Sequence, residues 1–196
     1  MRARFGTAGE SDSFRARGYR TGAQIPQYLR EFELDAFEYQ CGRGVRLSES
    51  TAAAIRAAAA AQGIVYSLHA PYYISMSSLE EDKRLKSVDY ILQSARAVDM
   101  LGGKRVVIHT GSCGKQSREA ALEKALDTMR LARAAVDEAG LSHIILCPET
   151  MGKVGQLGTL EEVLALCRLD ERILPCIDFG HLNARTQGGL GAKQQM

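Results

Sequence analysis

The sequence predicts an α/β fold of the TIM (β/α)8-barrel type, with parallel strands that alternate with helices. Short apolar segments rich in β-branched residues alternate with longer segments of helical periodicity. Such repeated strand–helix units, joined by short loops, predict a parallel sheet with right-handed crossovers. Four apolar segments, 64–69, 105–109, 144–149 and 173–178, each end in a histidine or a carboxylate. Functional side chains at the carboxyl ends of successive strands are typical of the barrel.

The predicted strands number about six, and they lie at residues 2–5, 36–39, 64–68, 105–108, 144–148 and 173–177. A complete barrel typically needs about 250 residues, whereas this chain has 196. Two interpretations remain: an incomplete barrel, or an open, doubly wound sheet. We favour an incomplete barrel over residues 1–184, with an irregular tail at 185–196.

Helices are predicted between these strands from apolar periodicity and from capping residues. A short helix is expected at 24–32, and an alanine-rich helix, a helix at about 80–100 and two further helices follow it. Capping signals mark the helix ends: Ser48 and Gly63 around the alanine-rich helix, Ser78 with Glu81, Ser117 before a helix ending near Gly140, and Thr159 with Glu162.

The composition is that of an ordinary globular protein, with 45% hydrophobic and 24% charged residues. The net charge of +2 predicts no global basic field, so nucleic-acid binding would need a local patch. No apolar segment approaches the roughly 20 residues of a membrane span, and the N-terminus lacks an apolar signal core. These features predict a cytoplasmic protein without a membrane partner.

The five cysteines are odd in number and form no CxxC pair: Cys41, Cys113, Cys147, Cys167 and Cys176. This pattern predicts reduced thiols rather than disulfides or a thiolate zinc site.

The strand-end residues His69, His109 and Glu149 have the chemistry of a zinc site. Zinc binds imidazole nitrogen and carboxylate oxygen, and a catalytic zinc keeps an open position beside three protein ligands. Glu149 can bridge to a second ion shared with Asp178, and His181 can serve a further ion or a substrate. A single histidine at a strand end is more often structural, but buried carboxylates are rarely tolerated unless they are paired or bind a metal. His143 precedes its strand at the opposite edge, and we expect a structural role for it.

Four segments at the predicted strand ends form a recognisable set: Leu68-His69-Ala70-Pro71-Tyr72, Ile108-His109-Thr110-Gly111-Ser112, Pro148-Glu149-Thr150 and Cys176-Ile177-Asp178-Phe179-Gly180-His181. With these segments the sequence resembles endonuclease IV, the zinc-dependent apurinic/apyrimidinic (AP) endonuclease family 2 of the xylose-isomerase-like barrels.

The resemblance implies an enzyme of DNA base excision repair that hydrolyses the phosphodiester bond 5′ to an abasic site. It implies up to three zinc ions, of which His69, His109 and Glu149 hold one. Glu149, as the catalytic carboxylate, shares the second ion with Asp178, and His181 binds the third. The implied partner is DNA with abasic sites, and no obligate protein partner is indicated.

Two loops are candidates for contact with DNA. The resemblance places Tyr72 in a loop that enters DNA at the lesion. Arg43 and Arg46 flank Gly44 on the loop after the second strand, where they can contact phosphates. The alternative for the two arginines, a solvated surface, has equal weight.

The sequence also departs from the family pattern. The family's remaining ligands lie on strands after the sixth, so only the first zinc set is complete here. The segment Phe5-Gly6-Thr7-Ala8-Gly9 replaces the usual His-Val-Ser opening, and Thr-Met-Gly-Lys-Val-Gly-Gln follows Glu149. A divergent member of the family is therefore expected.

Two other functions remain open. A sugar isomerase or epimerase of the same superfamily would use one manganese or magnesium ion, but the paired imidazoles of His69 and His109 favour zinc. A catalytically inactive metal-binding remnant is the third possibility.

Overall fold

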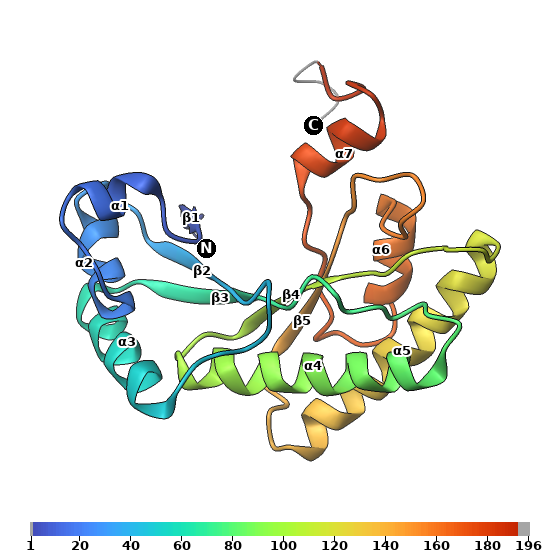
Figure 1. The fold of residues 1–196 in the computed structure, drawn as a ribbon, viewed down its shortest axis with the longest axis horizontal. Coiled ribbons are helices and arrows are strands. Elements are labelled where there is room, and N and C mark those ends of the chain that lie inside the picture. The colour runs from blue at the N-terminus through green and yellow to red at the C-terminus, as the bar shows by residue number, and fades with distance from the viewer. Residues whose placement is uncertain (1, 192–196) are drawn as a thin grey trace.

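The computed structural model describes residues 2–191 and shows a five-stranded parallel sheet (Figure 1). Each strand pairs with the next one along the chain, which is the strand order of a barrel wall and not the reversing order of a doubly wound sheet. The predicted α/β fold of incomplete-barrel type is therefore confirmed. The strands are β1 (Gly6–Ala8), β2 (Ala36–Gln40), β3 (Val65–His69), β4 (Arg105–His109) and β5 (Ile145–Glu149).

The helices lie between the strands and cover one face of the sheet, except for the last one, which stands apart at the top of Figure 1. They are α1 (Asp12–Ala16), the 3-10 turn η1 (Gly22–Gln24), α2 (Ile25–Arg30), α3 (Glu49–Gln62), α4 (Glu81–Met100), α5 (Arg118–Glu138), α6 (Leu160–Cys167) and α7 (Phe179–Arg185). No helix in residues 2–191 is both long enough and apolar enough to cross a membrane.

The core lies between the sheet and helices α1 to α6. Leu68, Ile108 and Leu146, from three adjacent strands, are fully buried in one cluster with Ile91 of α4 and Met129 of α5. Burying such a side chain contributes roughly 1.5–3 kcal/mol. The strand ends next to these residues are therefore held by the most stable part of the domain.

Most of the predicted helix ends are confirmed. Ser48 and Ser117 accept hydrogen bonds from the backbone N–H groups of Thr51 and Ala120, while Gly63 ends α3 in a left-handed conformation. Thr159 and Glu162 form the expected capping box.

The capping box predicted for Ser78 and Glu81 is wrong. The N-cap of α4 is Glu80, so Glu81 is the first helical residue and not the third, as a capping box requires. The Ser78 hydroxyl instead accepts a hydrogen bond from the N–H of Glu80 in the preceding turn.

The first strand was also predicted at the wrong place, because it begins at Gly6 and not within residues 2–5. The carbonyl of Phe5 accepts hydrogen bonds from both Asp35 and Ala36, so the chain enters the sheet directly after it. A Cβ at Gly6 would lie 1.8 Å from the Ala36 carbonyl oxygen, so this entry requires glycine.

The predicted sixth strand, 173–177, follows β5 as a parallel segment but forms only two isolated bridges to it. Pro148 lacks the N–H group that would complete the ladder, which is why no regular strand forms. Four backbone hydrogen bonds remain: Leu146 N–H to Arg172, Leu174 N–H to Leu146, Cys176 N–H to Pro148 and Thr150 N–H to Cys176.

The segment predicted as an irregular tail, 185–196, is only partly described. Arg185 still belongs to α7, and residues 186–190 form turns and a bend. Residues 192–196 lie outside the described part of the chain.

Candidate metal centre

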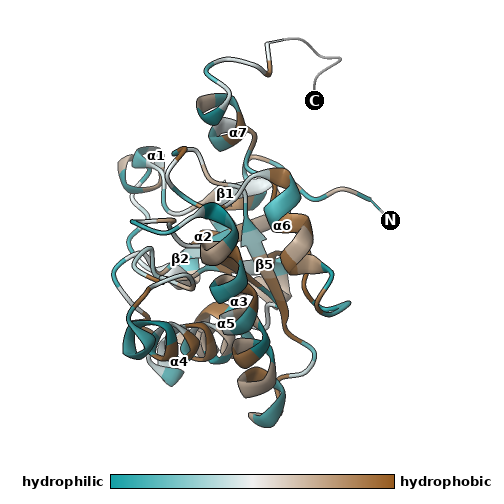
Figure 2. Ribbon diagram, turned by 90° about the vertical axis from the view of Figure 1, so that its right-hand side faces the viewer, coloured by the Kyte–Doolittle hydropathy of each residue, from teal (hydrophilic) through white to brown (hydrophobic). Residues whose placement is uncertain are grey.

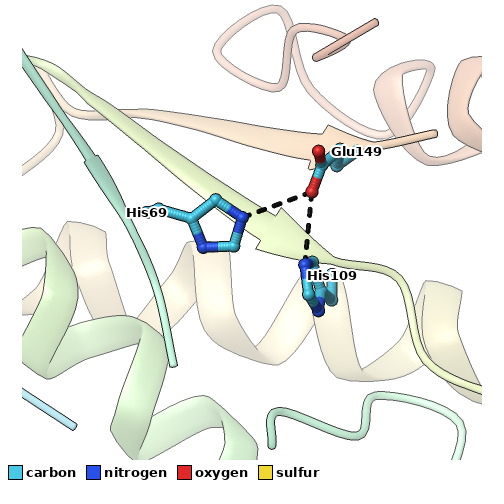
Figure 3. Close-up of side chains that lie close together, drawn as sticks. All are labelled: His69, His109 and Glu149. Atoms are coloured by element: carbon cyan, nitrogen blue, oxygen red, sulfur yellow. Dashed lines mark hydrogen bonds and ion pairs between the residues drawn. The ribbon is translucent and has the colours of Figure 1, made fainter. Parts of the chain in front are cut away.

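Three adjacent strands place His69, His109 and Glu149 side by side at the carboxyl edge of the sheet (Figure 3). The Nε2 atoms of both histidines lie 3.3 Å from the same oxygen, Oε2 of Glu149. The two imidazole rings are nearly perpendicular, and their centroids are 4.9 Å apart. The ligand atoms of the three residues lie within 4.8 Å of one another, close enough for the group to hold one metal ion.

His69 is oriented by a second hydrogen bond. Its Nδ1 lies 2.9 Å from the carbonyl oxygen of Ala70, so Nδ1 carries the proton and donates it. Nε2 then points at Glu149, to which it donates a hydrogen bond when protonated, and it would offer its lone pair to a bound ion. This arrangement is typical of metal-binding histidines, whose outer nitrogen is usually fixed by a carbonyl or a carboxylate.

Glu149 is only 5% exposed. Burial raises the pKa of its carboxyl group, but hydrogen bonds from His109 and His69 outweigh burial and lower this pKa to about 2. In His69, too, the hydrogen bonds outweigh burial. Burial lowers the pKa of the imidazole, but the hydrogen bonds to Glu149 and Ala70 raise it above its ordinary value. The carboxylate is therefore ionised at neutral pH, as metal binding requires.

A second group forms around the other oxygen of Glu149. Oε1 of Glu149 and Oδ2 of Asp178 each lie 3.5 Å from Nδ1 of His181, and these three residues also meet the geometry of a metal-binding group. Nδ1 of His181 is also 3.0 Å from the carbonyl oxygen of Thr150.

Asp178 has a structural role in addition, because it is the N-cap of α7. Its Oδ1 accepts a 2.7 Å hydrogen bond from the backbone N–H of His181. Any movement of α7 therefore moves Asp178 and His181 together.

Thr150 is part of the site, and the sequence interpretation did not single it out. Its hydroxyl accepts a hydrogen bond from the N–H of Asp178 at 2.9 Å and lies 3.3 Å from the Asp178 carbonyl oxygen, to which it donates. The only sequence signal is its place directly after Glu149 in the Pro-Glu-Thr motif.

The candidate DNA-contacting residues lie on two loops that touch. Tyr72 N–H donates to the carbonyl of Gly42, which joins the loop after β3 to the loop that carries Arg43 and Arg46. Tyr72 is 61% exposed, and both arginines are exposed. The structure thus brings these three residues to neighbouring loops, away from the core.

His143 lies at the other end of β5, where its Nε2 forms a 2.7 Å hydrogen bond with Asp99. The length of β5, Ile145–Glu149, separates His143 from Glu149.

The donor set fits zinc. Two imidazole nitrogens and one carboxylate oxygen are a set of protein ligands found in catalytic zinc sites. Glu149 offers its two oxygens to two different groups, which suits a carboxylate that bridges two ions.

Comparison with known proteins places the chain among α/β barrels. Residues 26–195 match the family described as xylose isomerase-like TIM barrel. An uncharacterised protein of Methanocaldococcus jannaschii is 33% identical over 188 residues, and a probable endonuclease 4 of Mycoplasma pneumoniae is 29% identical over 121 residues. The matches cover 94% and 59% of this chain, but only 64% and 41% of those proteins.

Solved structures of two kinds share the fold. Endonuclease IV from Thermus thermophilus superposes with a TM-score of 0.61 at 25% identity, over 85% of this chain and 66% of that one. A D-tagatose 3-epimerase-like protein superposes with a TM-score of 0.69 at 21% identity, over 84% of this chain and 63% of that one.

Proposed function

The chain belongs to the xylose isomerase-like TIM barrel family, and from that premise we propose that it is a zinc-dependent phosphodiesterase of the endonuclease IV type. One observation carries the proposal: two imidazoles from adjacent strands face one oxygen of a buried carboxylate, Glu149. The similarity to a probable endonuclease 4 and to an endonuclease IV structure supports the same activity. The proposed substrate is DNA with abasic sites, and the proposed location is the cytoplasm.

The proposed ligands of one zinc are His69, His109 and Glu149, and those of further zinc are Glu149, Asp178 and His181. Bound zinc would supply activation of a water molecule and stabilisation of the leaving oxygen of the phosphodiester.

The chain's own contribution is to fix these side chains before the substrate arrives. The hydrogen bond to Ala70 keeps Nε2 of His69 turned towards Glu149. Burial shields the Glu149 carboxylate from water, and its low pKa keeps it charged. We propose Glu149 as the catalytic carboxylate because it belongs to both ligand groups.

Contact with DNA is assigned to the two touching loops. Arg43 and Arg46 are exposed, and their charges suit the phosphate backbone. Tyr72 offers an exposed aromatic face that can pack against a base or into the gap left by a missing one.

A sugar epimerase is the second candidate, because structures of that kind share the fold. Paired imidazoles argue against it, since manganese and magnesium prefer sites richer in oxygen ligands. An inactive metal-binding protein is the third candidate.

Elemental analysis of the purified, unchelated chain, together with a nicking assay, tests the proposal. We expect zinc to co-purify with the wild-type chain and to be lost in His109→Ala. His143→Ala is the matched control, because this histidine is bonded to Asp99 outside the site, and it should keep its zinc. An oligonucleotide with one abasic site should be nicked by wild type and by His143→Ala only.

Manganese or magnesium in place of zinc, with turnover of a ketose, would support the epimerase instead. Equal zinc in wild type and His109→Ala would reject the site as assigned. Zinc without any nicking would favour the inactive metal-binding protein.

A further inference from the structure

We propose that Arg185 is a positioning residue that docks α7 on the loop after β5 and thereby places Asp178 and His181 against Glu149. The inference deepens the proposed function, because it concerns the second ligand group of the same site. It rests on how α7 is held.

Helix α7 cannot be positioned by core packing. Every residue of α7, Phe179–Arg185, is at least partly exposed, and Phe179 is 52% exposed. In Figure 2 the helix projects from the body of the domain, where most of the hydrophobic colouring is found. Polar contacts must therefore fix the position of this helix.

The side chain of Arg185 makes the largest set of these contacts. It donates to four carbonyl oxygens of the loop after β5: Nη1 to Met151 and Lys153, both at 2.9 Å, and Nη2 to Gln156 at 3.0 Å and Val154 at 3.4 Å. A guanidinium group suits this role, because its planar fork of donors can reach several acceptors at once.

Arg118 of α5 holds the same loop from the other side. It donates to the carbonyls of Val154 and Gln156, two of the four that Arg185 also contacts. Arg118 is in turn anchored by Glu162, with Nη1 2.6 Å from Oε1. Arg185 therefore docks on a loop that α5 and α6 already hold in place.

The loop approaches the second ligand group closely. A Cβ at Gly152 would lie 3.2 Å from Cδ2 of His181, so the loop backbone lies directly against this imidazole. Since Asp178 caps α7 and His181 lies within it, the contacts of Arg185 fix both residues relative to Glu149. The first group does not depend on them, because His69 and His109 lie at the ends of β3 and β4.

Hydrogen–deuterium exchange on metal-free protein tests the docking. In Arg185→Ala we expect faster exchange in peptides that cover residues 151–157 and 179–186, with no change in β3 and β4. Arg185→Lys should behave like Arg185→Ala, because one ammonium group cannot reach four carbonyls. Arg96→Ala is the control: Arg96 is exposed on α4 and has no side-chain hydrogen bond among the described residues.

A spectroscopic readout separates positioning from a general loss of structure. Long-range proton–nitrogen spectra of the histidine side chains should show altered His181 signals in Arg185→Ala, while the signals of His69 and His109 stay at their wild-type positions. Zinc equilibrium dialysis should then show about 10–100-fold weaker binding at the second group, as for loss of an outer-sphere partner, and unchanged binding at the first.

Wild-type exchange in residues 179–186 of Arg185→Ala would overturn the inference, and so would equal shifts of all three histidines. If the wild-type chain binds no zinc, the proposed function fails, but the exchange and histidine spectra still decide the role of Arg185.

Discussion

The two proposed ligand groups share Glu149 but are held by different parts of the molecule. His69, His109 and Glu149 lie at the ends of three strands whose neighbouring residues, Leu68 and Ile108 among them, are fully buried. Asp178 caps a short helix that contains His181, and every residue of this helix is at least partly exposed. Hydrophobic burial thus positions the first group, whereas hydrogen bonds from a few side chains position the second.

This difference predicts which substitutions disturb each group. A change in the core is expected to lower the free energy of unfolding of the whole domain, because packing is shared by every strand. A change in a polar anchor is expected to act mainly on one ligand group and to lower the free energy of unfolding less than a change in the core, since local structure can open separately.

The largest effect is expected from Glu149→Gln, because this residue is common to both groups. Replacing one carboxylate oxygen by an amide removes the charge and one ligand atom from the site. We expect zinc affinity at both groups to fall by more than the roughly 10–100-fold cost of losing an outer-sphere partner. Equilibrium dialysis would measure the zinc affinity, and Glu138→Gln, at an exposed glutamate outside the site, is the control. Wild-type zinc affinity at either group in Glu149→Gln would show that the two groups do not share Glu149.

Ile108→Ala tests the role of the core under the first group. The side chain is fully buried directly before His109, and its truncation should lower the free energy of unfolding by about 2–5 kcal/mol. Urea denaturation followed by circular dichroism would measure the change. Arg185→Ala should leave the urea concentration at the midpoint of unfolding close to that of wild type. Equal destabilisation by both variants would contradict the division between the two regions.

Thr150→Val should affect the second group alone. It removes the hydroxyl that accepts from Asp178 N–H and leaves this donor without its partner, at a cost of about 1–3 kcal/mol. Zinc binding at the second group should weaken about 10–100-fold, while binding at the first stays constant. Thr150→Ser keeps the hydroxyl and should retain near-wild-type binding; failure of this rescue would count against the hydrogen bond as the cause.

The smallest effect concerns the anchor of the loop, Glu162, and depends on pH. Burial raises the pKa of this carboxyl group, but the hydrogen bonds from Arg118, Thr159 and Gly158 outweigh burial and lower the pKa below its ordinary value. A lowered folded-state pKa stabilises the protein above the unfolded-state pKa, and this contribution is lost as the pH falls through the folded-state value.

The free energy of unfolding of Glu162→Gln should therefore be lower than that of wild type at pH 7. This gap should narrow below the unfolded-state pKa of about 4.3. Denaturation curves at several pH values would measure it. A gap that stays constant on acidification would show that the Glu162 charge has no part in holding the loop.

The proximity of the residues in the first group could be predicted from the sequence because it follows from local patterns. His69, His109 and Glu149 each end a short apolar segment, and parallel strands bring their carboxyl ends to one edge. The segment 173–177 shows a similar apolar pattern, but it contains Pro175, and the missing N–H of Pro148 on the neighbouring strand interrupts its pairing. The first strand was misplaced because neither residues 2–5 nor Gly6-Thr7-Ala8 contain an apolar run that would mark a strand.

The supports of the second group could not be predicted in this way. Arg185 acts through the carbonyls of a loop some thirty residues earlier in the chain, and backbone carbonyls have no sequence signature. Thr150 acts through its hydroxyl on Asp178, which depends on the fold that brings the two together. Such contacts come from tertiary structure alone.

X-ray diffraction at the zinc absorption edge, from crystals of the chain grown with zinc, tests the central claim most directly. The account predicts an anomalous peak in contact with Nε2 of His69, Nε2 of His109 and Oε2 of Glu149, and its disappearance in His109→Ala. Zinc bound elsewhere in the crystal, with no peak at these three strand ends, would contradict it.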